Sequence, residues 1–142
     1  MSSNRLVPAL AAAGAAVLVV SGCSSGYKAI GTHTAVVQIN GVEVGEPLPV
    51  RCEQVRWDWR IETLEETPGF TALVQTGDTV VARGVMLERL GGFTGSYWDG
   101  TVGSADAEVT NRTFRVTGTA KGYYLRDPSD TTTAEFVIRT DC

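Results

Sequence analysis

Cys23 is the residue whose surroundings most clearly predict a chemical step. It ends the run Leu18–Cys23, in which aliphatic residues are followed by Ser21 and Gly22 directly before the cysteine. This order is typical of a lipobox, where the thiol is lipidated and the cysteine becomes the new N-terminus after cleavage. The alternative is an ordinary secretory signal cut after Gly22 that leaves Cys23 free. An unpaired cysteine at the cleavage point of an exported protein otherwise has no purpose, so we predict lipidation of Cys23.

The segment before Cys23 has the pattern of an export signal. Met1–Arg5 is short and carries one positive charge, and Leu6–Val20 is apolar apart from Pro8 and Gly14. This run is short for a membrane-spanning helix, which needs roughly twenty apolar residues. We therefore expect residues 1–22 to be a cleaved lipoprotein signal peptide.

The anchor predicts where the mature protein lies. A diacylglyceryl thioether brings two acyl chains, which hold a protein at a membrane far more firmly than one. We expect the membrane to be a partner through this acyl anchor, with the protein on the outer face of the cell membrane; a cell-wall location or shedding are the alternatives. Residues 23–34 would form the lipidated N-terminus and a short tether, and residues 35–142 one domain.

The two remaining cysteines, Cys52 and Cys142, predict a disulfide bond. An exported protein lies where disulfides persist, and with Cys23 lipidated these are the two cysteines left. The bond would also fix the C-terminal residue, which otherwise frays. The alternative is two separate buried thiols. No metal site is expected, because two cysteines and one histidine do not supply four ligands.

Composition limits the partners. The whole chain has a net charge of −4, and loss of the leader with Arg5 makes the mature chain more negative. An acidic chain argues against nucleic acid as a partner. The single histidine, His33, falls in the tether, and no Gly-x-Ser-x-Gly motif is present. We therefore expect no catalytic residues and no cofactor.

The pattern after the tether predicts successive strands. Sixteen glycines with abundant Thr and Val favour short strands and turns. Asn40-Gly41 is a strong hairpin signal, and Gly84 inside Thr79–Leu90 suggests a bulge. We predict one all-β domain, an antiparallel β-sandwich or partly open barrel. The other expected strands include Ala35–Ile39, Val50–Thr63, Phe70–Gln75, Phe93–Trp98, Ser104–Val109, Thr113–Ala120 and Ala134–Cys142, with a polar loop at Asp127–Thr133.

The expected strand Val50–Thr63 carries the most distinctive side chains. Period-two alternation would place Val55, Trp57, Trp59 and Ile61 on one face. Trp57 and Trp59 are candidate ligand-facing aromatics lining a lipid-binding cavity, and a filled core is the simpler interpretation. A second aromatic group is a candidate exposed patch for a partner or sugar: Tyr97, Trp98, Tyr123 and Tyr124.

Several stretches of the mature chain, in order, resemble one known family. They are Val50-Arg51-Cys52, then Tyr97 with Gly100–Ala107, then Val116–Ala120 with Gly122, and finally Phe136–Cys142. Together with the leader ending Ser21–Ser25, these residues resemble the mycobacterial LpqH lipoprotein family, known as the nineteen-kilodalton lipoprotein antigen. The resemblance runs from about Val36 onward.

The resemblance implies a lipid-anchored surface antigen of the mycobacterial envelope. It also implies a link to innate immune sensing through the acylated N-terminus, with a host innate immune receptor as the partner, and a role in adhesion to host cells. It carries over Cys23 as the lipid site and the pair Cys52 and Cys142 as a bond. From the residues and the resemblance, we expect a non-enzymatic surface antigen or interaction domain. The alternative is a carrier for an envelope lipid or glycolipid, bound behind the Trp57 and Trp59 strand.

Overall fold

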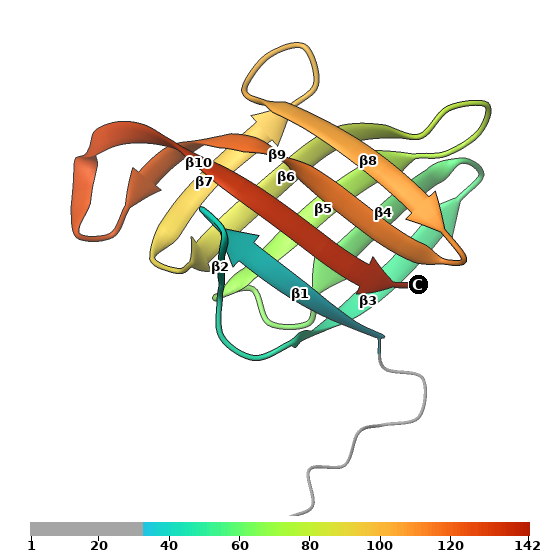
Figure 1. Cartoon of the computed structure of the whole chain (residues 1–142), viewed down its shortest axis with the longest axis horizontal. Coiled ribbons are helices and arrows are strands. Elements are labelled where there is room, and N and C mark those ends of the chain that lie inside the picture. The colour runs from blue at the N-terminus through green and yellow to red at the C-terminus, as the bar shows by residue number, and fades with distance from the viewer. Residues whose placement is uncertain (1–32) are drawn as a thin grey trace, which may run out of the picture.

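The structure is a computed structural model that describes residues 33–142 (Figure 1). The expected signal peptide and the lipidation site at Cys23 lie outside the described residues. Within the described part the chain forms strands and turns, and it holds no helix long and apolar enough to cross a membrane. The ten strands are β1 (His33–Ile39), β2 (Val42–Glu43), β3 (Leu48–Val55), β4 (Asp58–Thr63), β5 (Gly69–Gln75), β6 (Val81–Leu90), β7 (Phe93–Trp98), β8 (Ser104–Thr110), β9 (Thr113–Tyr124) and β10 (Asp127–Asp141).

The strands form one antiparallel sheet that closes on itself. The order of hydrogen-bonded neighbours is β10-β1-β3-β4-β5-β6-β7-β9, and β9 pairs with β10 to complete the ring. The short β2 pairs with β1, and β8 pairs with β9 beside β7. Figure 1 shows β1, β8 and β10 crossing in front of β4, β5 and β6, as in a flattened ring. The prediction of an all-β sandwich or partly open barrel is confirmed.

The core lies inside this ring because each strand alternates between an inward and an outward face. On β1, for example, Ala35, Val37 and Ile39 are buried while the residues between them are only partly covered. The largest fully buried side chains come from β4, β5, β6, β7, β9 and β10, and include Ile61, Leu87, Leu90, Phe93, Phe114, Phe136 and Ile138. Their burial supplies the main apolar stabilisation of the domain.

The turn signals in the sequence are mostly confirmed. Asn40 and Gly41 have φ values of 50° and 79° and join β1 to β2, which is the conformation that an Asn-Gly hairpin adopts. The predicted bulge also exists, because the pairing of β5 with β6 shifts register beside Gly84. Strand β1 begins at His33, two residues before its expected start, and His33 pairs with Val50.

One predicted strand is wrong: Val50–Thr63 is a hairpin and not a single strand. β3 and β4 pair antiparallel, and the turn lies at Arg56 and Trp57, with φ of 58° at Arg56. In this register an even-numbered residue of β3 lies opposite an odd-numbered residue of β4, as Cys52 lies opposite Ile61. Even-numbered residues therefore point inward on β3, whereas odd-numbered residues point inward on β4. No proline or glycine marks the turn, so the sequence gives no local signal for it.

Two further expectations at the C-terminal end are wrong. The strand expected to end at Ala120 continues through Gly122 to Tyr124, and Gly122 pairs within the sheet where a Cβ would lie 1.9 Å from the carbonyl oxygen of Thr94. Residues 127–133, expected to be a polar loop, form the start of β10, with a register irregularity between Asp127 and Thr132. The long β9–β10 hairpin is stabilised along most of its length by main-chain pairing, which overrides the polar composition.

Candidate functional site

Trp57 occupies the exposed tip of the β3–β4 turn. Its side chain is 62% exposed. The turn is fixed to the neighbouring β5–β6 turn, because the backbone N–H and the Oγ1 hydroxyl of Thr76 both donate to the carbonyl oxygen of Trp57, at 2.7 and 3.2 Å. The indole lies beside Gly77, where an added Cβ would be 4.0 Å from two ring atoms. The backbone of the turn is therefore fixed, and the ring that it carries is exposed.

Trp59 points the other way, into the ring of strands. Its side chain packs against the core, and its ring centroid lies 4.9 Å from that of Phe114 on β9, with an angle of 56° between the planes. This tilted contact is a favourable aromatic geometry. Trp57 and Trp59 consequently do not share a face, which corrects the expectation from alternation.

A disulfide joins β3 to the last residue of the chain. The Sγ atoms of Cys52 and Cys142 are bonded at 2.01 Å, with the Cα atoms 6.0 Å apart. The bond closes a loop with a sequence separation of 90 and agrees with the pairing expected from the two cysteines. Arg112 also donates to the main-chain oxygen of Cys142, and the N–H of Cys142 donates to the carbonyl oxygen of Arg112, so the C-terminus is fixed on several sides.

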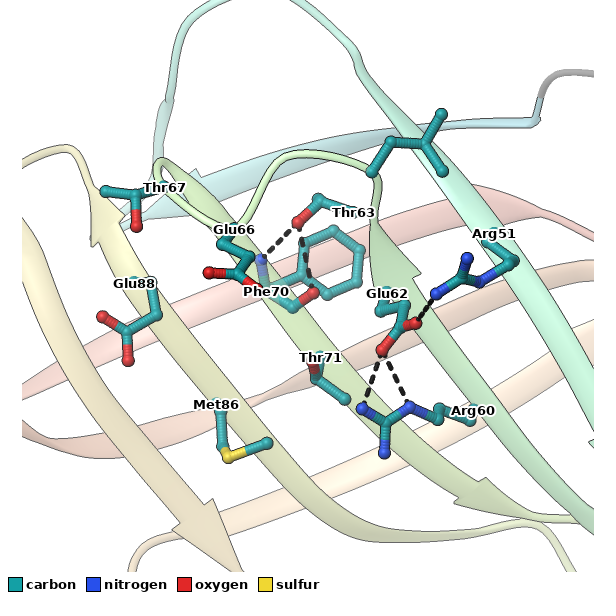
Figure 2. Close-up of a pocket in the computed structure, with 11 residues that line it drawn as sticks. Arg51, Arg60, Glu62, Thr63, Glu66, Thr67, Phe70, Thr71, Met86 and Glu88 are labelled. Carbon is teal, nitrogen blue, oxygen red and sulfur yellow. Dashed lines mark hydrogen bonds and ion pairs between the residues drawn. The ribbon is translucent and has the colours of Figure 1, made fainter.

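The outer face of β3 to β6 carries a network of ion pairs. Glu62 lies between Arg51 of β3 and Arg60 of its own strand (Figure 2). Arg60 Nη2 is 2.8 Å from Glu62 Oε2, and Arg60 Nε donates to the same oxygen at 2.8 Å. Hydrogen bonds from Arg51 and then Arg60 lower the pKa of Glu62, and the bond to Glu62 raises the pKa of Arg51. Glu62 is therefore ionised at neutral pH and is not a proton donor there.

A second charged cluster lies farther along the same face. Arg83 of β6 donates from Nε to the side-chain oxygen of Gln75 at 3.0 Å, and its Nη1 lies 2.6 Å from a carboxylate oxygen of Asp99. These contacts orient the guanidinium from both ends. Nothing in the sequence indicates this role for Arg83, because a charged residue before Gly84 suggests only a solvent-exposed position. The β-bulge between Ala82 and Gly84 determines where the Arg83 side chain lies.

These clusters border three adjoining hollows on the outer face of β3 to β6, which we call the outer groove. The first, about 500 Å³, lies beside the 64–68 loop and includes Arg60, Glu66 and Glu88. The second, about 300 Å³, is largely apolar at Val55 and Leu73 and is bordered by Arg60 and Arg83. The third, about 470 Å³, lies under Trp57 and again includes Arg83. Because neighbouring hollows share Arg60 and then Arg83, they adjoin one another.

Figure 2 shows the first hollow of the outer groove. Glu66, Glu88 and Met86 surround it opposite the Glu62 ion pairs. The loop beside it is held by Thr63, whose Oγ1 hydroxyl donates to the Glu65 carbonyl oxygen at 2.6 Å and accepts from the Phe70 N–H at 3.1 Å. The wall of the hollow is thus made by a fixed loop and by strand side chains.

The structure separates the four aromatic residues expected to form an exposed patch. Tyr97 is buried, and its hydroxyl donates to the carbonyl oxygen of Ala82 at 2.9 Å. Burial, followed by the nearby charge of Asp99, raises the pKa of Tyr97. Trp98 and Tyr123 are 38% and 37% exposed and lie on β7 and β9. Tyr124 is partly buried and packs against the core, so the four side chains do not form one patch.

In the described part of the chain, the side chains that could act in catalysis or bind a metal do not form a catalytic arrangement. His33 lies in β1, opposite Val50. Among residues 33–142, no group of three or more His, Cys, Asp or Glu side chains is placed to hold a metal ion. The arrangement offers a surface with an exposed aromatic ring on a fixed turn, paired charges and a groove.

The fold and site define a small, disulfide-closed, all-β domain with a grooved outer face. Residues 28–142 match the family described as "Mycobacterium 19 kDa lipoprotein antigen", and the chain belongs to this family. A "Putative lipoprotein" of Mycobacterium avium subsp. hominissuis (strain TH135) is 34% identical over 140 residues, which cover 98% of this chain and 96% of that protein. A "Probable lipoprotein LppE" of Mycobacterium tuberculosis (strain ATCC 25618 / H37Rv) is 30% identical over 142 residues, covering 98% of this chain and 99% of that protein.

These relatives confirm the resemblance seen in the sequence. Both relatives are named as mycobacterial lipoproteins, as is the family. Membership implies association with a membrane through a lipid anchor. It also agrees with the lipobox that ends at Cys23.

Proposed function

We propose that this protein is a non-enzymatic lipoprotein that displays its β domain on the outer face of the cell membrane as a surface antigen or interaction domain. Lipidation of Cys23 would supply the anchor, and residues 24–32 would separate it from β1. An extended chain spans at most about 3.3–3.6 Å per residue, so the domain would remain close to the membrane.

The ion pairs of the outer groove are the observation that favours binding over catalysis. An acid catalyst at neutral pH needs a raised pKa, which burial or a like charge provides. Glu62 has the opposite environment, because Arg51 and Arg60 lower its pKa. Arginines held by carboxylates, next to an exposed aromatic ring, are typical of surfaces that bind another molecule.

A host innate immune receptor is the partner that the family's description as an antigen favours. In this proposal the acylated Cys23 is the group recognised, and the β domain determines how that N-terminus is presented. Cell-wall attachment or shedding would change the amount of protein that reaches a receptor, but not the group that is recognised.

The carrier alternative has weaker support. A lipid bound inside the ring behind Trp59 would compete for the space that Phe114 fills, since the two rings lie 4.9 Å apart. The apolar hollow near Val55 and Leu73 lies on the outer face and holds about 300 Å³, which is at the small end for a ligand site. Interaction at the outer surface is therefore the better-supported function.

The anchor is tested by Cys23→Ala expressed in a mycobacterial host. We expect the wild-type protein to partition into detergent with an acyl mass on residue 23, and the variant to lose both. A Cys23→Ala variant that partitions into detergent like wild type would contradict the anchor.

Surface labelling of intact cells tests the outer-face location, and labelling that requires cell lysis would contradict it. Native mass spectrometry of protein from the envelope tests the carrier alternative, which predicts a co-purifying lipid.

A further inference from the structure

We propose that the outer groove binds an uncharged polysaccharide chain, with Trp57 as the stacking platform for one sugar ring. This inference rests on the proposed function as an interaction domain and names the chemical class of its ligand. It depends on three features of the described residues: the shape of the groove, the exposed indole on a fixed turn, and the arrangement of donors and acceptors.

The shape of the groove suits an extended chain. The three hollows adjoin through Arg60 and Arg83 and follow the strands from the 64–68 loop to the β5–β6 turn. Thr71 in the first hollow and Gln75 in the third are four residues apart on β5, or roughly 13 Å along the strand. A long, shallow channel of this kind fits several linked units better than one compact molecule.

The indole of Trp57 is a prepared contact at one end of this channel. It is 62% exposed, and Thr76 fixes the backbone of the turn that carries it through two hydrogen bonds to the Trp57 carbonyl oxygen. The face of an indole carries negative charge density, which attracts the polarised C–H groups on one face of a sugar ring. Because tryptophan has two side-chain torsions and the backbone beneath it is fixed, binding loses little side-chain entropy.

The charges of the groove favour a neutral ligand. The arginines are already paired: Arg51 and Arg60 with Glu62, and Arg83 with Asp99. Among residues 33–142, the lining carboxylates of Asp58, Asp78, Glu66 and Glu88 make no ion pair, so an anionic ligand would be repelled.

The alternation of arginine and carboxylate also matches the chemistry of hydroxyl groups. Arginine only donates hydrogen bonds and an ionised carboxylate only accepts them, whereas a hydroxyl does both. Sugar hydroxyls along the channel can therefore accept from Arg60 and Arg83 and donate to Asp58 and Asp78. A basic peptide would satisfy the carboxylates but would meet the arginines at each junction of the hollows.

The test is affinity electrophoresis of the detergent-solubilised mature protein through gels that contain a neutral glucan, mannan or galactan. We expect at least one neutral polysaccharide to retard the protein, and Trp57→Ala to weaken that retardation at least tenfold. Tyr123→Ala is the matched control, because it removes an exposed aromatic residue outside the groove. Trp57→Phe keeps a stacking ring and should retain part of the binding.

Salt and competing probes separate the possible ligands. Retardation by a neutral polysaccharide should not change between low and high salt. Salt weakens interactions between exposed charges, and an uncharged ligand makes none. Retardation by none of the neutral polysaccharides, or equal weakening by Tyr123→Ala, overturns the proposal. Salt-sensitive binding of polylysine, or of the anionic polysaccharide alginate, in place of the neutral chains also overturns it. These outcomes do not depend on Cys23, so they are distinct from failure of the anchor.

Discussion

The indole of Trp98 lies directly over the backbone of Gly84, in the strand next to it. A Cβ added at residue 84 would lie 2.7 Å from Cε3 and Cζ3 of that ring. Gly84 and Trp98 are also cross-strand partners in the pairing of β6 with β7. The absence of a side chain at residue 84 is thus what allows the ring to cover this part of the sheet beside the bulge.

Gly84→Ala should therefore destabilise the domain by about 1–3 kcal/mol, the usual cost of forcing an extra methyl into a packed site. Urea unfolding followed by circular dichroism measures the change. The double variant Gly84→Ala with Trp98→Ala is the control, because removal of the ring makes room for the methyl. The cost of Gly84→Ala should be smaller in the Trp98→Ala background, and an unchanged cost would show that the ring contact is not its cause.

Loss of the disulfide should destabilise the protein strongly. The bond between Cys52 and Cys142 closes a loop with a separation of 90 residues, for which loop-closure entropy predicts about 4–5 kcal/mol. Urea unfolding with and without reductant measures this difference, and the double variant Cys52→Ala with Cys142→Ala should not respond to reductant. Mass mapping without reduction should recover the two peptides joined, and free thiols at both residues would refute the bond.

Truncation of the two tryptophans of the β3–β4 hairpin should change stability by different amounts. Trp59→Ala removes an aromatic ring from the core and should cost about 2–4 kcal/mol, somewhat less than for a fully buried ring. Trp57→Ala removes a ring that is 62% exposed and should change stability by about 0.5 kcal/mol or less. Chemical denaturation of both variants checks this order. Equal losses would mean that Trp57 also supports the core.

Glu62 should contribute stability that depends on pH. Its folded-state pKa is lowered by Arg51 and Arg60, so the contribution is complete above its unfolded pKa of about 4.3 and is lost as the pH falls through the folded-state value. Glu62→Gln should lower stability at neutral pH by up to about 1 kcal/mol and flatten the acid side of the stability profile.

Unfolding measured from pH 7 down to pH 3 tests this expectation. Glu88→Gln is the matched control, since Glu88 lines the same hollow of the outer groove without an ion pair in the described part of the chain. If both variants changed the profile equally, the effect would come from net charge and not from the ion pairs of Glu62.

Period-two alternation was sufficient to predict the all-β class and most strands. Phe93–Trp98 has the predicted limits, and Asn40-Gly41 forms the predicted turn, because each feature depends on residues close in the sequence. The β3–β4 turn was missed because Arg56 and Trp57 are poor turn markers. Alternation counted straight through this turn grouped Trp57 with the inward residues Trp59 and Ile61, whereas Trp57 lies in the turn itself.

The outer groove was beyond sequence reasoning for a related reason. Its residues come from β3, β4, β5 and β6, and their proximity depends on cross-strand register. The alternation that places Trp59 and Ile61 on one face of β4 leaves Asp58, Arg60 and Glu62 on the other, outward face. That Glu62 would lie between Arg51 and Arg60 required knowledge that residues 51 and 62 are opposite one another.

The sequence by itself determined the features that local order encodes: a lipobox before Cys23, a strand-rich domain, and family motifs in a recognisable order. The tertiary structure alone decided which face each side chain occupies, and therefore that Trp59 fills the core while Trp57 remains exposed beside the groove. The physical reason is that strand pairing joins residues distant along the chain, and a shift of one residue in register exchanges the buried and exposed faces.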